Sequence, residues 1–400
     1  MMNSINKAFK YRIYPTKEQE IKIAKHFGCC RFVWNYFLNE RQQYYLKNKE
    51  NIEAKRIKGS LNYYNNCAAL TKLKKELVWL NECNSQSLQA TLKDLEGSYR
   101  NFFRKTHKFP KYKSKYNPKQ SFKIPQSTKL NENKVYFHKF NEGIKIVIHR
   151  PIEGRILSAF LSKNETGKYF ISICCECEKP KSKPNDKIIG IDLGIKDFLV
   201  TSEGTKVSNP KYYIKTQSKL KYVQRRYSKY GGKRTKQKLA KLHEKITNQR
   251  HDFLHKLSSN LIDKNQAIIL EDLNVKGMLF NHNLAKSISD SSWSTFVQYL
   301  EYKANWHDRE IIKIDRFFPS SKMCHVCHNI NGNLTLSDRK WECSKCHTKL
   351  DRDLNASLNI LQQGLNKCCR NYSIKQYELS PLGEVLTTET PSFLVISDQR

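Results

Sequence analysis

The stretch IIGIDLGIKDFLV, residues 188–200, places one acid inside an apolar run. Its isoleucines before the acid are typical of a buried strand, and Phe198 to Val200 begin a second strand after a turn. Asp192 stands between them. An unpaired carboxylate in apolar surroundings carries a large free-energy cost. The sequence therefore predicts that a cation compensates Asp192.

Two further apolar segments end in acids. AIILEDLNVKGM (267–278) predicts a buried strand that ends at Glu271, and LDRDLNASLNIL (350–361) predicts a helix whose entrance holds Asp351 and Asp353. Three such acids from distant segments favour a divalent-metal site, since two Mg²⁺ ions about 4 Å apart promote phosphodiester hydrolysis. Oxygen ligands select Mg²⁺, with Mn²⁺ as a substitute, over zinc. Taken singly, each acid could equally be structural, as a helix cap or a surface residue.

Four of the 13 cysteines form two matched pairs, Cys324 with Cys327 and Cys343 with Cys346. Their spacing is that of a closed, structural four-cysteine zinc site holding one Zn²⁺. Both pairs also read C-x-x-C-H, the pattern of covalent haem attachment. The polar segment between the pairs and the zinc-like separation favour zinc.

The residue after each cysteine pair is a histidine, His328 and His347, where glycine is common. Among non-glycine residues, histidine tolerates a positive φ better than most, so we expect the same tight turn at both places. Cys174 and Cys177 are also spaced C-x-x-C, but no second pair lies nearby. We interpret them as structural thiols on a strand.

The net charge of +35 is too large for an ordinary solvated surface. It indicates a polyanionic partner, most simply nucleic acid, rather than a membrane surface. No apolar stretch approaches the roughly 18 residues of a membrane span. The start, MMNSINKAFKYRIYP, lacks a secretory apolar region. We therefore expect a cytoplasmic protein whose thiols stay reduced.

The first half of the chain predicts helices and then short strands. Thr16 and Gln19 form a capping box that opens a helix over 14–45, and further helices are expected near 66–79 and 84–104. A basic, proline-punctuated linker follows at 108–125. Residues 134–177 then read as short strands, which we interpret as a small β-barrel that includes the strand near 7–14.

Residues 186–360 alternate strands with helices, which favours an α/β domain. Asn355 and Asn359 share one helix face at i, i+4. Trp293, Phe296 and Leu300 share a face of another helix, where core packing is expected. From about 366 the chain is polar, and little order is expected. The strands fall near 187–193, 197–201, 267–272 and 311–315, and one long basic helix near 216–260.

Five segments, in order along the chain, resemble the TnpB (OrfB) proteins of bacterial insertion sequences. They are GIDLGIKDF, LEDLNVKGM, FFPSSKMCHVC, WECSKC and DRDLNASLNI, and the amino-terminal YRIYPTKEQE and FGCCRFVWNYFL continue the likeness. The resemblance covers roughly residues 5–362. It implies an RNA-guided DNA endonuclease related to compact type V CRISPR effectors.

The resemblance implies that Asp192, Glu271 and Asp353 form the Asp-Glu-Asp triad of an RNase H-like (RuvC) nuclease domain. Asp353 is preferred to Asp351 because it immediately precedes the helix start. Ser357 stands where the family usually has alanine. The implied domains are a β-barrel (wedge) at 1–15 and 108–183, a helical recognition domain at 16–107, the RuvC-like domain at 184–319 and 347–365, an inserted zinc ribbon at 320–346, and a disordered tail at 366–400.

The implied partners are a guide RNA derived from the transposon end and double-stranded target DNA with a short adjacent motif, bound by a monomer in the bacterial cytosol. Base pairing would then set the target sequence. Gln86 and Gln89 are candidates to read adenine edges. Arg225, Arg226 and Arg352 are candidates to contact phosphates.

Three alternatives stay open at this point. The first is a nuclease-inactive, RNA-guided DNA-binding repressor on the same scaffold. The second is a transposase, or an accessory protein of one, that joins DNA ends. The third is a junction resolvase that works without RNA. The presence of all three acids favours the active nuclease over the repressor.

Overall fold

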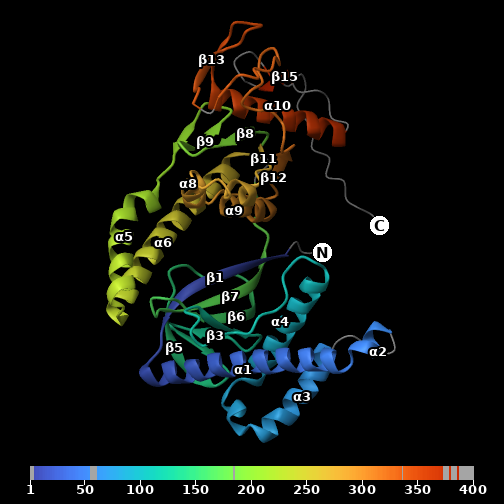
Figure 1. Ribbon diagram of the computed structural model, residues 1–400, viewed down its shortest axis with the longest axis vertical. Coiled ribbons are helices and arrows are strands. Elements are labelled where there is room, and N and C mark those ends of the chain that lie inside the picture. The colour runs from blue at the N-terminus through green and yellow to red at the C-terminus, as the bar shows by residue number, and fades with distance from the viewer. Residues whose placement is uncertain are drawn as a thin grey trace. The chain divides into compact units, whose positions relative to one another are not determined.

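The structure is a computed structural model that describes residues 4–54, 61–182, 185–335, 337–372, 378–379 and 385–386. The chain divides into two compact units, residues 1–179 and 180–400 (Figure 1). Among the described residues, no helix combines the length and the apolar character that crossing a bilayer requires.

A seven-stranded antiparallel sheet forms the centre of the first unit. The strand near 7–14 joins it as predicted: β1 pairs with β7 on one side and β5 on the other. The described strands form an open sheet rather than the predicted barrel, because no pairing joins edge strand β2 to edge strand β3. Helices α1 and α4 contact β2 instead. The strand order is β2 (Gln120–Ile124), β6 (Arg155–Lys163), β7 (Tyr169–Glu178), β1 (Ser4–Tyr14), β5 (Phe140–Val147), β4 (Lys134–Phe137) and β3 (Lys129–Asn131).

Helices and sheet in this unit share one hydrophobic core. The predicted capping box is confirmed, since the Gln19 N–H donates to the Thr16 hydroxyl and the Gln19 side chain accepts from the Thr16 N–H. The two further predicted helices are also found, shifted by up to three residues. The helices are α1 (Lys17–Lys47), α2 (Lys49–Glu53), α3 (Tyr63–Glu76), the 3₁₀ helix η1 (Val78–Glu82) and α4 (Ser85–Phe103).

The basic linker is fastened to helix α1. The Trp34 indole donates to the Lys111 carbonyl at 3.0 Å, and the Asn35 amide exchanges two hydrogen bonds with the Lys113 backbone. On β7, Cys175 and Cys177 face the core, whereas Cys174 lies on the other face of the sheet. The C-x-x-C spacing of Cys174 and Cys177 thus points the two thiols to opposite faces, which agrees with structural roles.

The second unit contains a five-stranded sheet in the order β10-β9-β8-β11-β12. Strands β8, β11 and β12 are parallel, and β9 and β10 extend the sheet in antiparallel pairs. All four strands predicted here are confirmed, with bounds shifted by at most one residue. The strands are β8 (Ile188–Leu193), β9 (Asp197–Thr201), β10 (Lys206–Ser208), β11 (Ala267–Glu271) and β12 (Glu310–Ile314).

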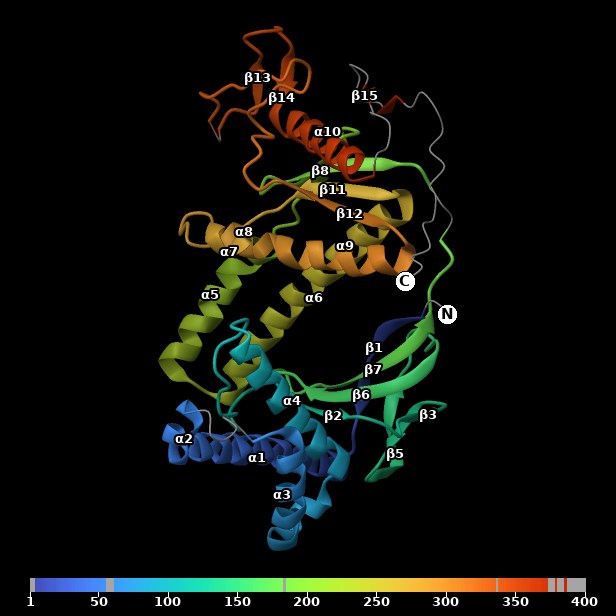
Figure 2. The same cartoon turned by 90° about the vertical axis from the view of Figure 1, so that its right-hand side faces the viewer.

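Helices cover both faces of this sheet, as Figure 2 shows for α9 and α10. Because side chains alternate along a strand, β11 turns Ile268 and Leu270 toward α6 and α9, and Ala267 and Ile269 toward α10. The apolar stripe from Trp293 to Leu300 packs in the core as predicted. The helices are α5 (Tyr212–Tyr230), α6 (Lys233–Lys264), α7 (Val275–Met278), α8 (Ala285–Ser291), α9 (Trp293–His307) and α10 (Arg352–Tyr372).

Two predictions about helices were wrong. The single basic helix expected over 216–260 is two helices, α5 and α6, because Gly231 and Gly232 take positive φ values of 63° and 89° that end one helix and begin the next. The chain also stays ordered past 366. Helix α10 continues to Tyr372, and the Lys367 ammonium donates to the Lys313 carbonyl at 2.8 Å.

A short pair, β15 (Glu378–Leu379) and β16 (Val385–Leu386), lies beyond α10. The other residues of the predicted tail from 373 onward lie outside the described residues.

Candidate carboxylate site and cysteine metal centre

Two of the acids singled out from the sequence lie side by side at the carboxyl ends of parallel strands. Ile191 on β8 pairs with Leu270 on β11, so the next residues along the two strands, Asp192 and Glu271, are neighbours. Both side chains are half-buried. The parallel register thus brings together acids that are 79 positions apart in the sequence.

Helix α10 adds the third acid because two glycines let it lie close to the sheet. A Cβ atom at Gly190 on β8 would meet the Ser357 carbonyl oxygen of α10 at 2.4 Å. A Cβ atom at Gly364 on α10 would meet the Ile269 side chain, also at 2.4 Å. This close approach directs the first turn of α10, which carries Asp353, toward the carboxyl end of β8, which carries Asp192.

The preference for Asp353 over Asp351 gains a structural reason. Asp351 accepts the Leu354 N–H at 3.1 Å and the Lys206 ammonium at 2.7 Å, so it caps α10 and is paired. Asp353 lies on the inner side, where it contributes to the electrostatic environment of Asp192. Its own ion pair with Arg339 is longer, at 3.3 Å.

The pKa of Asp192 reflects the nearness of the other two carboxylates. Burial, followed by the charges of Glu271 and Asp353, raises the pKa of Asp192 to about 8. The Arg352 guanidinium and the Leu193 N–H act in the opposite direction and do not outweigh them. Among the described side chains, the Arg352 guanidinium does not outweigh the two carboxylates that act on Asp192, so the cation expected from the sequence stays a prediction.

Glu271 is held by a residue that the sequence reasoning missed. The Ser320 hydroxyl donates to the Glu271 Oε1 atom at 2.5 Å, at the short end of the range for a hydroxyl bound to a carboxylate. Burial raises the pKa of Glu271, and this hydrogen bond opposes the rise. Ser320 lies in FFPSSKMCHVC, one of the segments that resemble TnpB proteins, but nothing in that stretch taken alone indicates that its hydroxyl reaches Glu271.

Two asparagines of α10 fasten the segment that contains Ser320. Asn359 donates its amide hydrogens to the Ser320 and Met323 carbonyls at 2.8 and 2.6 Å, and Asn355 donates to the Met323 carbonyl at 2.7 Å. The Asn355 carbonyl in turn accepts the His325 N–H at 2.9 Å. The i, i+4 spacing predicted their shared face. Both side chains are buried, and their amide groups are hydrogen-bonded within this polar clamp, as buried polar groups require.

The clamp borders the cysteine cluster, since Cys324 lies between Met323 and His325. The sulfur atoms of Cys324 and Cys346 are 3.7 Å apart, and those of Cys327 and Cys343 are 3.5 Å apart. A tetrahedral ion with zinc–sulfur bonds of about 2.3 Å separates its sulfurs by about 3.8 Å. The four cysteines could therefore hold a zinc ion.

The two cysteine turns are built alike. His328 and His347 have positive φ values of 58° and 54°, which confirms the conformation expected where glycine is common. The N–H of each donates to the first cysteine of its pair at 2.9 Å. A short hairpin, β13 (Lys340–Glu342) with β14 (Lys349–Asp351), carries the second pair.

The cysteine cluster and the carboxylates differ in how tightly they gather. Within the part of the chain that the structure describes, the cysteines are the one group of three or more metal-ligating side chains with ligand atoms all within 4.8 Å of one another. The oxygens of Asp192, Glu271 and Asp353 are spaced more widely, with Asp192 as the shared neighbour of the other two.

Arg352 points inward rather than outward. Its guanidinium donates to the Thr335 and Asp338 carbonyls at 3.2 and 3.4 Å, and its side chain is 13% exposed. It thus joins the hairpin insertion to α10. Arg339, half-exposed beside Asp353, is a better placed cation that the sequence reasoning missed.

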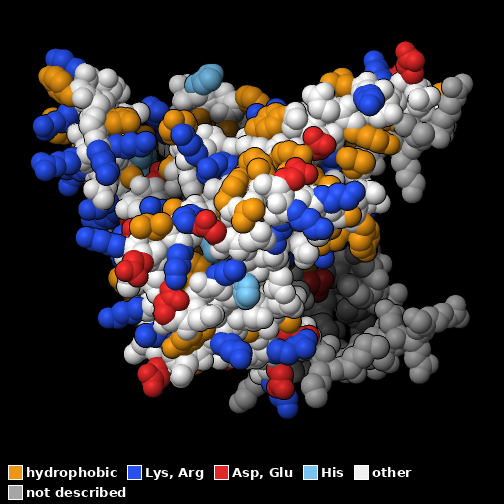
Figure 3. Space-filling view, turned by 90° about the horizontal axis from the view of Figure 1, so that it is seen from below, with side chains coloured by type: hydrophobic (Ala, Val, Ile, Leu, Met, Phe, Trp, Pro, Cys, Tyr) orange, Lys and Arg blue, Asp and Glu red, His pale blue; other side chains and the backbone are white. Residues whose placement is uncertain are grey.

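The other predicted nucleic-acid contacts lie on one helix of each unit. Gln86 is half-buried and Gln89 exposed on α4 of the first unit, while Arg225 and Arg226 are exposed on α5 of the second. Lys and Arg side chains outnumber Asp and Glu over the face shown in Figure 3, in keeping with the net charge.

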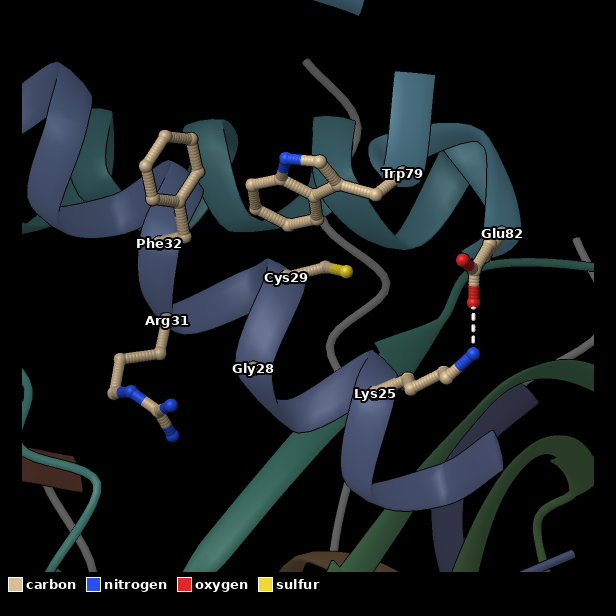
Figure 4. Close-up of a pocket in the computed structure, with 7 residues that line it drawn as sticks. All are labelled: Lys25, Gly28, Cys29, Arg31, Phe32, Trp79 and Glu82. Atoms are coloured by element: carbon tan, nitrogen blue, oxygen red, sulfur yellow. Dashed lines mark hydrogen bonds and ion pairs between the residues drawn. The ribbon is translucent and has the colours of Figure 1, made fainter. Parts of the chain in front are cut away.

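The described residues of the first unit line at least three pockets. The first is basic: Arg31 and the linker lysines Lys113, Lys119 and Lys123 line it, together with Asp94, and this groove suits a phosphate backbone. The second, shown in Figure 4, lies between α1 and η1, where Lys25 pairs with Glu82. The third is lined by the predicted contact Gln89 together with Lys74 and Lys75.

The second pocket has an aromatic wall. The Trp79 ring packs edge-on to Phe32 with ring centroids 5.0 Å apart, and Cys29 lies beside them (Figure 4). Its Lys25 and Glu82 side chains already neutralise each other as an ion pair. The pocket contains none of the acids singled out from the sequence, so it is separate from the carboxylate site.

Three family models match the chain. A family described as a probable transposase, OrfB_IS605, matches residues 172–281, and its helix-turn-helix domain matches residues 1–50. The Cas12f1-like TNB domain matches residues 293–360. In this structure the described part of residues 1–50 is mainly strand β1 and one long helix, α1.

Similar proteins span the whole chain. A Streptomyces pristinaespiralis protein named "Putative RNA-guided DNA endonuclease" is 36% identical over 402 residues, which cover 98% of each chain. "Putative RNA-guided DNA endonuclease InsQ" of Escherichia coli K12 is 28% identical over 380 residues, covering 89% of this chain and 92% of its own. The cryo-EM structure of the Cas12f1-sgRNA-target DNA complex superposes with a TM-score of 0.55 at 15% identity, covering 90% of this chain and 99% of that one.

The mixed sheet with helices on both faces and the cysteine hairpin beside it define a protein with the Cas12f1-like fold. Within that class, the full-length match at 36% identity shows the family. The chain belongs to the OrfB (TnpB) family of insertion-sequence proteins.

Proposed function

We propose that this chain is an RNA-guided DNA endonuclease encoded by an insertion sequence, and that Asp192, Glu271 and Asp353 hold its catalytic Mg²⁺. The observation that carries the proposal is the position of Asp192. It is half-buried at the carboxyl end of the central strand β8, next to Glu271 and within the electrostatic reach of Asp353. The names of the full-length relatives support the activity. The net charge of +35 supports nucleic-acid partners.

The three acids suit a pair of ions rather than one. Their oxygens are too widely spaced for a compact three-ligand cage, but ligands of two different ions need not touch one another. Asp192, which faces both other acids, would contact both ions. Bound Mg²⁺ or Mn²⁺ would supply charge that activates water and stabilises the leaving oxygen.

The protein's own groups prepare this site. Ser320 fixes one oxygen of Glu271 through its hydroxyl, and the amide of Asn359 fixes Ser320. The Arg339 guanidinium lies at the exposed side of Asp353, where it can meet a phosphate of the approaching strand. A zinc ion held by the four cysteines would stabilise the turn that carries Ser320.

The remaining partners follow from the same proposal. A guide RNA derived from the transposon end would pair with one strand of target DNA, so base pairing sets the sequence. A monomer in the bacterial cytosol would carry out the reaction. The basic groove formed by Arg31 and the linker lysines would contact the nucleic-acid backbone rather than the bases.

The test begins with purification from the native locus and sequencing of the RNA that co-purifies. A guide redirected to a plasmid target should then cause Mg²⁺-dependent cleavage that a chelator abolishes. Asp192→Ala should abolish cleavage and leave RNA binding intact. Asp351→Asn is the matched control, because asparagine also caps helices and Asp351 is paired with Lys206. Cleavage by Asp192→Ala at the wild-type rate would refute the assignment.

One alternative is favoured by the description of the matching family as a probable transposase. A transposase would join DNA ends, so the same reaction would yield rejoined products. A nuclease-inactive repressor would bind the guided target without cutting it. A junction resolvase would cut after the RNA had been removed. Guided cleavage without joining separates the endonuclease from all three.

A further inference from the structure

Residues 315–319 form a short arch whose two ends both meet Glu271. At the start of the arch, Ile314 pairs with Glu271 across the parallel strands β12 and β11. At its end, the Ser320 hydroxyl donates to the Glu271 carboxylate at 2.5 Å. A five-residue segment whose two ends both contact Glu271 cannot extend its backbone more than about 10 Å from that residue, even when the chain is fully extended. The arch therefore borders the carboxylate site.

The centre of the arch presents one aromatic ring to solvent. Phe317 is 89% exposed, more than any other large apolar side chain in the described part of the chain. Its neighbour Phe318 turns the other way and packs against the core beneath α10. A single exposed apolar residue is common on protein surfaces, so exposure alone decides nothing. The position of its arch beside Glu271 is what distinguishes this ring.

The arch is held in place rather than loose. The Asp315 carboxylate accepts the Phe317 N–H at 2.9 Å, and the Asp315 carbonyl accepts the Phe318 N–H at 3.3 Å. Arg316 pairs with Asp272, the residue after Glu271. The backbone that carries Phe317 is therefore held in a defined place, which lowers the cost of ordering when the ring binds.

The charge and chemistry around Phe317 indicate which kind of group binds to its ring. An exposed aromatic ring in a protein of net charge +35 suits a nucleobase, because every base has a face on which a ring can stack. In a duplex both faces of a base are covered by its neighbours. The ring can thus stack on an unpaired base, whose strand would pass its phosphates between the half-exposed guanidinium of Arg339 and the carboxylates.

Resting on the proposed function, we propose that Phe317 stacks on an unpaired base of the DNA strand next to the bond that is cut. Stacking holds that strand in register with Asp192, Glu271 and Asp353. The ring makes no contact with the reacting atoms, so Phe317 is a positioning residue. Its loss lowers the cleavage rate about 5- to 150-fold, the range to which aromatic–base stacking corresponds.

The test uses the full chain with its co-purified guide RNA and DNA targets that carry one abasic nucleotide at successive positions of each strand. Single-turnover rates in Mg²⁺ are compared for the wild type, Phe317→Ala and Phe317→Trp. We expect one abasic position near the cut to slow the wild type. Phe317→Ala should be equally slow on intact DNA and show no further loss at that position. Phe317→Trp should restore both the rate and the abasic effect.

Tyr230→Ala is the matched control, since Tyr230 is 71% exposed at the end of α5 in the same unit. It should cleave at the wild-type rate. Wild-type cleavage by Phe317→Ala, an abasic effect that persists in it, or the same loss in Tyr230→Ala overturns the inference. So does sensitivity confined to abasic positions far from the cut. A wild-type complex that cuts no guided target overturns the proposed function as well, so the two failures are distinguishable.

Discussion

The close contact between α10 and β8 makes Gly190→Ala a direct test of how the carboxylates are assembled. A Cβ atom at position 190 would lie 2.4 Å from the Ser357 carbonyl oxygen and 2.8 Å from the Leu361 nitrogen. Ordinary contact begins at 3.4 Å, so the helix must retreat by about 1 Å. The contacting atoms belong to the helix backbone, which cannot rotate away as a flexible side chain would.

The magnitude follows from this geometry. Overpacking of this kind costs about 1–3 kcal/mol of the free energy of unfolding. For a unit of this size that corresponds to a fall in Tm of about 2–4 °C for each kcal/mol. A shift of about 1 Å in the first turn of α10 also moves Asp353 away from Asp192, and misplacement by that distance costs about 100-fold in rate.

The assay combines thermal unfolding with single-turnover cleavage of a guided target. Gly97→Ala is the control, because a Cβ atom there meets nothing within 4 Å and the residue lies inside helix α4. That variant should match or exceed the wild type in stability, by about 0.5–1 kcal/mol. A Gly190→Ala protein with the wild-type Tm and the wild-type rate would refute the argument that this glycine sets the position of α10.

Three further predictions concern buried polar groups. Asn359→Leu removes both hydrogen bonds to the segment carrying Ser320, so we expect about 1–3 kcal/mol lower stability and a higher Mg²⁺ requirement for cleavage. Cys343→Ser, or a zinc chelator, should release one zinc ion per chain and expose the segment around Lys322 to trypsin. Burial lowers the pKa of Lys303 to about 8, so stability should rise between pH 8 and 10.5 by up to about 3 kcal/mol, a rise that Lys303→Met should lack.

The sign of the Lys303 effect follows from proton binding. Between the two pKa values the unfolded chain holds a proton that the folded chain has released, so raising the pH favours the folded state. Urea unfolding of the wild type and Lys303→Met at several pH values measures the difference. If the free energy of unfolding changed with pH equally in the two proteins, this explanation would be contradicted. For the other two predictions, an unchanged Mg²⁺ requirement in Asn359→Leu, or a metal-free wild-type protein, would be the contrary result.

The sequence located most elements of the second unit because each has a strong local signal. The buried strands around Ile189 and Ile268 are continuous apolar runs, which parallel strands covered on both faces require. In the first unit, the capping box at Thr16 likewise marked the start of α1 to within a residue. The break at Gly231 and Gly232 was missed although a Gly-Gly pair is a local turn signal, and both residues take positive φ values there.

The open form of the first sheet could not be derived from the sequence. Alternating strands predict a sheet, but whether its edges close depends on which surfaces cover them. Here α1 and α4 pack against β2, and residues of these helices and of the sheet share one core. Such packing between distant segments leaves no local pattern to detect.

The sequence by itself determined the chemistry available to this protein: three acids at the ends of apolar elements, four thiols at metal spacing and a large positive charge. It did so because burial costs and ligand spacing are local properties. The tertiary structure alone decided the neighbours. Parallel register placed Glu271 beside Asp192, the glycine at 190 admitted α10, and Ser320 reached Glu271 through a turn fastened by Asn359. Proximity of this kind arises from packing between segments far apart in the chain, which no single stretch encodes.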